Sequence, residues 1–277
     1  MNKKYFTPKK IHAYLRAAIQ LVFFLFLPSA FTTAFSGIKS VLTQIGAGNP
    51  IAWSSFLTVL LALCAYTIVF GRFFCGYACA FGTLGDAVHS LYLFLCKKCK
   101  KKPLLLKKSW KKPLSYVKYA VLLAVVLLCF LGVYGDLTGW SPWDVFSMLR
   151  SGNFKVGAYW LGCILLVLIL VGMVFCERFF CRFLCPMGAV FSLLPILPFF
   201  SVRRKREKCA KGCTACEKVC PSDLSLPEDG SWNVSGDCFQ CQKKNAKSSI
   251  RNFRGNEIWF TLLRAVVLAA VLILAGI

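Results

Sequence analysis

A run of closely spaced cysteines near the C-terminal end most constrains what this chain can be. The run comprises Cys209, Cys213, Cys216 and Cys220, and Pro221 follows directly. The intervening gaps are three, two and three residues, close to the iron–sulfur pattern of two, two and three residues that ends in Cys-Pro. Soft thiolates suit iron–sulfur clusters or zinc, but zinc sites favour two well-separated Cys pairs. The run therefore predicts a [4Fe-4S] cluster, with a zinc site and a disulfide framework as alternatives.

A second cysteine motif lies downstream of this run and is incomplete. Cys238 and Cys241 occupy the first two ligand positions of another such run, but Lys244 and Ser248 stand where the third and fourth cysteines would fall. Two-cluster ferredoxins exchange their fourth cysteines between clusters, and that exchange cannot operate fully here. Either one cluster takes all its ligands locally, or ligands come from elsewhere in the chain.

Two hypotheses complete the second motif. In the first, Cys96 and Cys99, a Cys-x2-Cys pair in a basic loop, join Cys238 and Cys241 in a second cluster. In the second, Cys220 joins Cys238 and Cys241. Counting iron per chain after replacing Cys96 and Cys99 with serine separates the two.

The chain is strongly apolar and yet carries a large positive charge. It is 57% hydrophobic and 16% charged, with a formal net charge of +23. Basic residues gather in 3–16, 72–118 and 178–254, and these stretches bracket long apolar runs. Cytoplasmic loops of membrane proteins carry such an excess of Lys and Arg. We expect a multi-pass protein of the cytoplasmic (inner) membrane, in contact with lipid and without a nucleic-acid partner.

The apolar runs predict an all-α membrane protein with about five transmembrane helices. The expected spans are 13–35, 50–70, 116–133, 156–175 and 258–277. Residues 36–49 and 135–155 are expected as outer loops, and 80–95 as an interfacial or re-entrant helix. The predicted domains are a bundle over 1–200, a cytoplasmic ferredoxin-like 4Fe-4S insert over 201–255, and a last spanning helix over 256–277.

The bundle contains an internal repeat. Residues 72–82 read RFFCGYACAFG and residues 178–188 read RFFCRFLCPMG. Both contain Arg-Phe-Phe-Cys, three residues, a second Cys and, three positions later, Gly. On a helix, cysteines four residues apart lie on one face, and duplicated membrane halves place their sites at the repeat interface. The repeat therefore predicts that four thiolates converge at the inner mouth of the bundle: Cys75, Cys79, Cys181 and Cys185.

Three interpretations of this quartet compete. It holds an iron–sulfur site shared by the two halves, or it forms two redox-active dithiols, or its cysteines pack as small apolar residues. The duplicated Arg72 and Arg178 would stabilise thiolate or cluster charge, or bind anionic lipid. Three other cysteines lie within apolar spans and are expected in the core: Cys64, Cys129 and Cys163.

The combination of duplicated Phe-Cys-x3-Cys motifs and a ferredoxin-type cysteine run resembles the NapH/NosR-type family of membrane ferredoxin proteins. The resemblance covers about residues 50–250. The family motif usually ends in Cys-Pro; Cys185-Pro186 follows it, whereas Ala80 follows Cys79. The resemblance implies [4Fe-4S] clusters and electron transfer between the quinone pool or a cytoplasmic donor and a partner reductase.

We therefore expect an electron-transfer subunit that makes and breaks no bonds of its own, because no nucleotide-binding loop or acid–base constellation is evident. Quinone is a possible further cofactor, and quinone or redox subunits are the expected partners. The alternative function is a redox-sensing or maturation and assembly protein of the membrane that uses clusters or dithiols.

Overall fold

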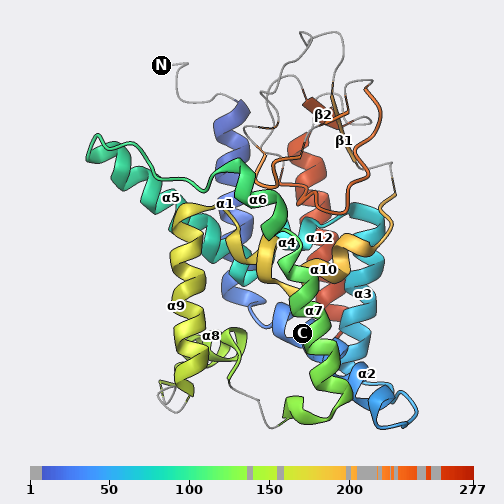
Figure 1. Cartoon of the computed structure of the whole chain (residues 1–277). Helices are drawn as coiled ribbons and strands as arrows, with labels where there is room; N and C mark the ends of the chain where they lie inside the picture. The colour runs from blue at the N-terminus through green and yellow to red at the C-terminus, as the bar shows by residue number, and fades with distance from the viewer. Residues whose placement is uncertain are drawn as a thin grey trace. The chain divides into compact units, whose positions relative to one another are not determined.

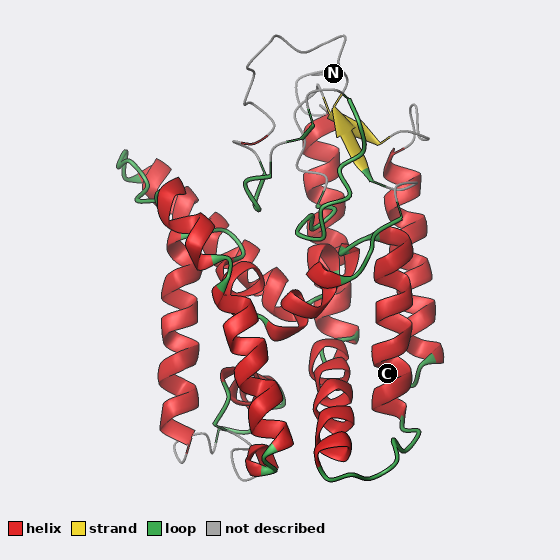
Figure 2. Ribbon diagram, turned by 45° about the vertical axis from the view of Figure 1, so that its right-hand side comes forward, coloured by secondary structure: helices red, strands yellow, loops and turns green. Residues whose placement is uncertain are grey.

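The computed structural model of this chain is dominated by helices (Figures 1 and 2). It describes residues 8–135, 140–154, 159–197, 201–204, 217, 220–224, 226–227, 230–241, 248–250 and 257–277. Apolar residues make up most of the long helices, and each of these helices ends at a glycine, a proline or a polar turn.

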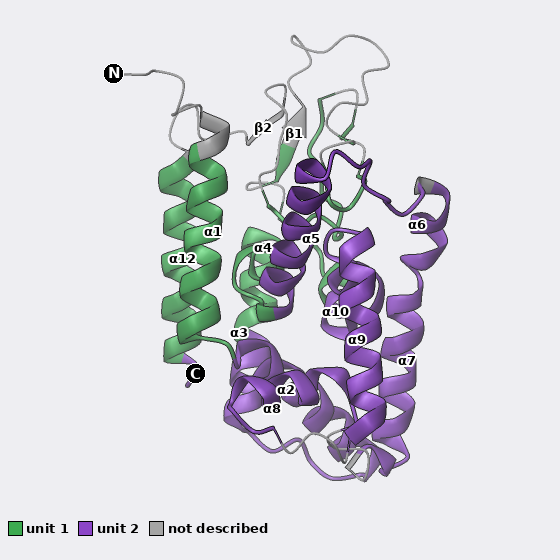
Figure 3. Ribbon diagram, turned by 90° about the vertical axis from the view of Figure 1, so that its left-hand side faces the viewer, with its two compact units in different colours: residues 1–28, 62–80, 191–274 green, residues 29–61, 81–190, 275–277 purple. Residues whose placement is uncertain are grey.

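The chain forms two compact units, each built from several separate segments (Figure 3). Unit 1 comprises 1–28, 62–80 and 191–274, and unit 2 comprises 29–61, 81–190 and 275–277. Cys75 and Cys79 of the first motif share unit 1 with the ferredoxin-like segment, which follows the second motif. Cys181 and Cys185 of the second motif share unit 2 with the helix after residue 80, which follows the first motif.

Unit 1 is built from long helices around a short one. Its helices are α1 (Pro8–Phe26), the second half of α3 (Ser55–Phe70), α4 (Phe73–Tyr77) and α12 (Glu257–Leu274). Helices α1 and α12 lie side by side (Figure 3), and both contact α4. A small antiparallel sheet pairs β1 (Val202–Arg204) with β2 (Ser248–Ile250) and places Val202 opposite Ile250. The sheet therefore joins the two ends of the ferredoxin-like segment.

Unit 2 contains the remaining helices. These are α2 (Ala30–Gly46), α5 (Ala80–Lys98), α6 (Lys108–Leu114), α7 (Val117–Phe130), α8 (Pro142–Arg150) and α9 (Trp160–Phe175), with the short turns η1 (Val133–Gly135) and η3 (Phe180–Leu184). Helix α10 (Pro186–Leu193) begins in this unit. The core is aromatic: the Phe81 ring lies 4.6 Å from that of Phe180, and the Phe35 ring lies 5.1 Å from Trp143.

The structure corrects the prediction that residues 36–49 form an outer loop. The first apolar helix breaks at Pro28, and a second helix, α2, runs on from Ala30 to Gly46. One face of α2 is buried through Phe31, Phe35 and Ile38. Small and polar residues suggested a loop here, but this buried face outweighs their weak helix propensity. Likewise, the predicted outer loop 135–155 contains α8, which Ser141 caps by accepting the Asp144 N–H.

Helices occupy all the predicted spans, but most are shorter than a bilayer requires. Within the described residues, one stretch is long and apolar enough by itself to cross a membrane, Ser109–Phe130, and the broken pair Ile11–Phe26 and Ala30–Gly46 meets the same criterion when counted together. Three further apolar helices are shorter: Ser55–Phe70, Trp160–Phe175 and Ile258–Leu274. The helical fold is thus confirmed, and the number of spans stays a prediction.

Candidate metal centre

The two Cys-x3-Cys motifs share a backbone hydrogen bond of a kind that a regular α-helix does not contain. In the first, the Cys79 N–H donates to the carbonyl oxygen of Phe74 at 3.0 Å. In the second, the Cys185 N–H donates to the carbonyl oxygen of Phe180 at 2.9 Å. Both bonds span five residues, which is the spacing of a π-turn, and such turns concentrate at functional sites. The repeat predicted from sequence therefore recurs in the backbone.

The expectation that each cysteine pair lies along one helix is wrong, because the chain leaves the helix before the second cysteine of each motif. Cys75 lies inside α4, which ends at Tyr77, so Cys79 falls between α4 and α5. Cys181 lies in the π-helical η3, and Cys185 is extended, with φ −73° and ψ 115°. The chain thus changes direction at the second cysteine of each motif. All four sulfur-bearing residues are at most 5% exposed.

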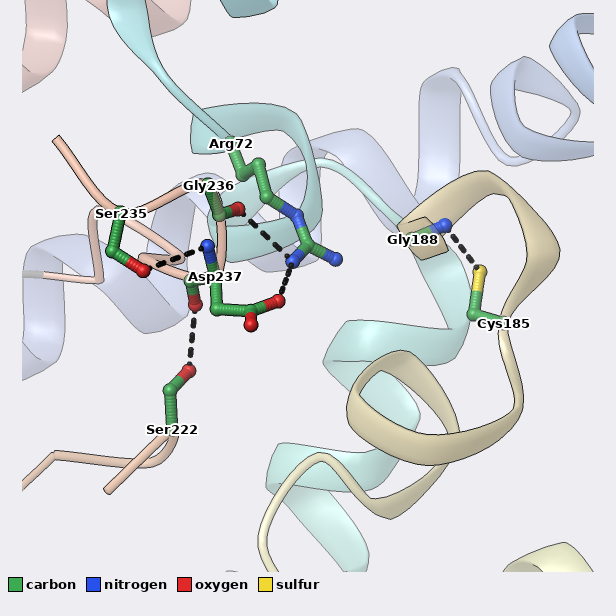
Figure 4. Close-up of polar contacts among 7 residues, drawn as sticks. All are labelled: Arg72, Cys185, Gly188, Ser222, Ser235, Gly236 and Asp237. Atoms are coloured by element: carbon green, nitrogen blue, oxygen red, sulfur yellow. Dashed lines mark hydrogen bonds and ion pairs between the residues drawn. The ribbon is translucent and has the colours of Figure 1, made fainter. Parts of the chain in front are cut away.

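Cys185 also caps the helix that follows it. Its Sγ accepts a hydrogen bond from the Gly188 N–H at 3.2 Å (Figure 4). Pro186 occupies the first position of α10, where its missing N–H costs nothing. A backbone N–H directed at sulfur favours the thiolate, and hydrogen bonds to ligand sulfurs help set the potential of an iron–sulfur centre.

In unit 1, Arg72 joins the first motif to the ferredoxin-like segment. Its Nη1 donates to the Gly236 carbonyl and to Asp237 Oδ1, both at 3.2 Å (Figure 4). Its guanidinium also lies 4.9 Å from the centroid of the Phe239 ring. Arg72 is 1% exposed. The alternative interpretation, that it binds anionic lipid, is therefore wrong.

The loop carrying Cys238 and Cys241 packs directly on α4. A Cβ at Gly76 would collide with the carbonyl oxygen of Phe239. The Tyr77 hydroxyl donates to the Cys241 carbonyl at 3.5 Å. Phe239 is 3% exposed, so it anchors the loop in the unit. Two cysteine motifs that are far apart in sequence are thus packed against each other.

Cys220 belongs to the same arrangement. The Ser222 hydroxyl donates to the Asp237 carbonyl at 2.8 Å and ties the Cys220 turn to the Cys238 loop (Figure 4). Burial, and to a smaller extent the charges of Cys241 and Cys220, raise the pKa of the Cys238 thiol to about 12. Burial likewise raises the pKa of Cys220, to which the charge of Cys241 adds. The three sulfurs therefore lie within electrostatic reach of one another.

Arg72 opposes these effects, since its positive charge lowers the pKa of Cys238. The three thiols and the guanidinium fit an anionic cluster, because ligation requires thiolates and a nearby cation stabilises them. Among the residues that the structure describes, no three acidic, histidine or cysteine side chains are grouped for a single metal ion. A cubane cluster spaces its ligands more widely than one ion does.

The remaining predicted ligands stay predictions. Cys209, Cys213 and Cys216 lie outside the described residues. Cys96 lies in the last turn of α5 and Cys99 directly follows that helix; both belong to unit 2 rather than to the unit of Cys238. The proposed quartet divides equally between the units. Of the predicted core cysteines, Cys129 is buried, whereas Cys64 and Cys163 are partly exposed.

In unit 2, Arg178 is held by a carboxylate. Its Nε donates to Asp86 Oδ1 at 3.1 Å and its Nη2 to Oδ2 at 2.6 Å, a bidentate pair. The Arg178 side chain is 0% exposed, so this arginine does not bind lipid either. Arg178 adopts φ +58°, a left-handed conformation that is uncommon for residues other than glycine. The arginine of each repeat thus pairs with an aspartate that follows the motif of the other repeat.

Sequence reasoning missed Asp86, Asp237 and Gly76. An available signal was the scarcity of acidic residues, since Asp86 is the first one in the chain. A carboxylate in so basic a chain is a natural partner for a duplicated arginine. The sequence contains no signal for the role of Gly76, because that role depends on the carbonyl group of Phe239, which is far away in the chain.

The chain matches a family model described as a 4Fe-4S binding domain over residues 52–113 and 158–206, which include both repeat motifs. An uncharacterized protein of Methanocaldococcus jannaschii is 32% identical over 195 residues, which span 70% of this chain and 70% of that protein. This chain belongs to the NapH/NosR-type family of ferredoxin-type proteins.

Two named relatives of this NapH/NosR-type chain carry ferredoxin in their names. The methylamine utilization ferredoxin-type protein MauN of Paracoccus denitrificans is 27% identical over 69% of this chain and 65% of its own length. The ferredoxin-type protein NapH of Haemophilus influenzae is 26% identical over 64% and 59%. No solved structure matches. The family is one of iron–sulfur electron transport, and its cofactor is a [4Fe-4S] cluster.

Proposed function

We propose that this chain is a membrane-bound electron-transfer protein that passes electrons between a cytoplasmic donor or the quinone pool and a partner reductase. The observation that carries the proposal is the packing of the Cys238–Cys241 loop on the first Cys-x3-Cys motif. A bound [4Fe-4S] cluster supplies one-electron oxidation and reduction. The packing would place such a cluster next to a second set of thiols, as a relay requires.

The ligand set we propose follows the exchange seen in two-cluster ferredoxins, where the cysteine before the proline ligates the other cluster. Cys220 precedes Pro221 and lies within electrostatic reach of Cys238 and Cys241. These three cysteines would hold one cluster, and Cys209, Cys213 and Cys216 would contribute to another. Arg72 would stabilise the thiolates, and the buried Phe239 would exclude water.

Membrane attachment is supported by the surface of the helices. Large apolar side chains are exposed along α7, α9 and α12, among them Leu127, Leu168 and Leu263. Such a surface is costly in water and natural in lipid. The basic stretch between α5 and α7, rich in lysine, would face the cytoplasm and place the ferredoxin-like segment on that side.

Iron and sulfide per chain, with EPR spectra of dithionite-reduced protein purified without oxygen, test the ligand set. Cys238→Ser and Cys241→Ser are expected to lose iron and an EPR signal, whereas the matched pair Cys96→Ser and Cys99→Ser is expected to keep both. Loss of iron and of the EPR signal in the Cys96→Ser and Cys99→Ser variants would show that this pair also provides ligands. Reoxidation of the reduced protein by quinone tests electron transfer; a cluster that no quinone or reductase reoxidises would favour sensing.

A further inference from the structure

A hairpin at one end of unit 2 carries a dense group of lysines. Helix α5 runs to Lys98, and residues 99–107 lead back to α6. The Leu104 N–H donates to the Tyr92 hydroxyl at 2.8 Å, and this bond fastens the returning segment to α5. The tip of the hairpin projects beyond the other helices of the unit (Figures 1 and 2). We call residues 91–112, which include most of α6, the lysine hairpin.

The hairpin carries charge of one sign. Residues 97–112 contain nine lysines, and no Asp or Glu occurs in residues 87–135. Most of these lysines are exposed: Lys97, Lys98, Lys100, Lys101, Lys102, Lys107 and Lys112. A block of like charges repels itself, and a surface of opposite charge stabilises it. The hairpin therefore favours an anionic partner.

Large apolar side chains lie among the lysines and are exposed as well. Leu91 and Phe94, three residues apart on α5, are 59% and 62% exposed, and Leu104 and Trp110 are 68% and 62% exposed. Surfaces that face water rarely gather so many large apolar side chains. Lysines beside such side chains suit the boundary between headgroups and acyl chains, where the ammonium groups stay among the headgroups and the apolar groups enter the lipid.

The hairpin also adjoins the ends of two apolar helices. The stretch Ser109–Phe130, which is long and apolar enough to cross a membrane, begins within it. The Leu106 N–H donates at 3.1 Å to the carbonyl oxygen of Phe175, the last residue of α9. The lysines therefore lie where headgroups would surround these helices. Lysine clusters next to the cytoplasmic end of a span are typical of segments that bind anionic lipid.

We propose that the lysine hairpin is a binding site for anionic phospholipid, in which its lysines hold headgroup phosphates and its exposed apolar side chains enter the acyl layer. This inference rests on the membrane attachment within the proposed function and adds the class of lipid that the protein gathers around itself. An acidic soluble protein would match the charge of the lysines, but it would not give the apolar side chains among them an apolar environment. The combination therefore favours lipid.

Fluorescence quenching in proteoliposomes tests the proposal. The vesicles contain equal amounts of phosphatidylcholine and phosphatidylglycerol, and the acyl chains of only one of the two lipids are brominated. The contribution of Trp110 is isolated by comparison with Trp110→Phe. Brominated phosphatidylglycerol is expected to quench this contribution about twofold more than brominated phosphatidylcholine, because lysines near the membrane surface enrich anionic lipid there.

Three variants separate charge at the hairpin from charge elsewhere. Lys107→Gln combined with Lys112→Gln is expected to remove most of the preference, whereas arginine at both positions is expected to keep it. Lys39→Gln is the matched control, because the Lys39 ammonium lies 4.9 Å from the centroid of the Tyr134 ring, beyond the other end of α7. This variant is expected to keep the wild-type preference.

Several outcomes would overturn the proposal. Equal quenching of wild-type Trp110 by the two brominated lipids would do so, and would leave an acidic protein as the partner of the lysines. A preference that the double glutamine variant keeps would show that these charges do not select the lipid. If that variant does not reconstitute, the wild-type preference is expected to fall as salt concentration rises, and a preference that does not depend on salt would overturn the proposal. Wild-type protein that stays in aqueous solution without detergent would instead refute the membrane attachment, and iron-free protein would refute the electron transfer, so these failures are distinguishable.

Discussion

Gly76 shows how much of the candidate site depends on one missing methyl group. The Phe239 carbonyl approaches its Cα so closely that no side chain fits, and the loop bearing Cys238 and Cys241 rests there. By contrast, Gly85 in α5 has only ordinary contacts with Met173 at the position of a Cβ. The two glycines are therefore a matched pair for testing the docking of the loop.

Gly76→Ala is expected to destabilise the protein by about 1–3 kcal/mol, because the loop must shift to avoid overpacking. It is also expected to lower the iron bound per chain. Gly85→Ala is expected to be neutral or stabilising by up to about 1 kcal/mol, since alanine favours helix over glycine. Thermal denaturation and iron analysis check both. Equal iron in the two variants would contradict the docking described here.

Cys238 gives a prediction about pH in the metal-free protein. With its pKa raised to about 12, it is a neutral thiol at neutral pH. The raised pKa means that folding favours the protonated form, so its contribution to stability is present below the ordinary pKa of cysteine and is lost as pH rises towards about 12.

Alkylation by iodoacetamide, followed site by site with mass spectrometry, measures this effect because only the thiolate reacts. Cys238 is expected to react much more slowly at pH 8 than the exposed Cys99, and its rate is expected to increase steadily at higher pH. Equal rates at pH 8 would show that the Cys238 thiol is not held in its protonated form.

At the scale of elements, the two repeats differ in how their arginines are compensated. Arg178 forms a bidentate pair with Asp86 of α5, whereas Arg72 shares one carboxylate oxygen and one carbonyl of the ferredoxin-like segment. The Arg178 pair links the turn of the second motif to α5. The Arg72 pair links α4 to the segment with the remaining cysteines. A duplicated residue thus supports two different connections.

Arg178→Met is expected to destabilise unit 2 by about 3–5 kcal/mol, because it leaves the Asp86 carboxylate without this partner in a largely buried place. Arg178→Met combined with Asp86→Leu is expected to recover much of that loss, since a well-packed apolar pair replaces a buried ion pair at little cost. Denaturation of the two single variants and the double variant measures the coupling. Additive effects would mean that the pair contributes nothing.

At the scale of the whole molecule, the basic stretch between α5 and α7 determines the predicted orientation. It contains Cys99, which is exposed. A membrane-impermeant maleimide is expected to label Cys99 in inverted vesicles and not in intact cells, because basic loops stay in the cytoplasm. Cys99→Ser is the control for labelling elsewhere. Labelling in intact cells would contradict the predicted orientation, because Cys99 would then lie outside the cytoplasm.

The sequence by itself determined the chemistry and most of the helices. Thiol spacing predicted the [4Fe-4S] cofactor because closely spaced cysteines that end in Cys-Pro are typical of ferredoxin cluster ligands. Apolar runs predicted the helices because backbone groups in apolar surroundings must bond within their own segment. The duplicated motif recurred as a duplicated backbone turn.

Only the tertiary structure decided which parts adjoin. The continuation of the first helix into α2, the break at Cys79 and Cys185, and the partners of Arg72 and Arg178 all depend on contacts between residues far apart in the chain. Local patterns do not encode these contacts, because a buried face or a carboxylate from another segment outweighs weak local propensity.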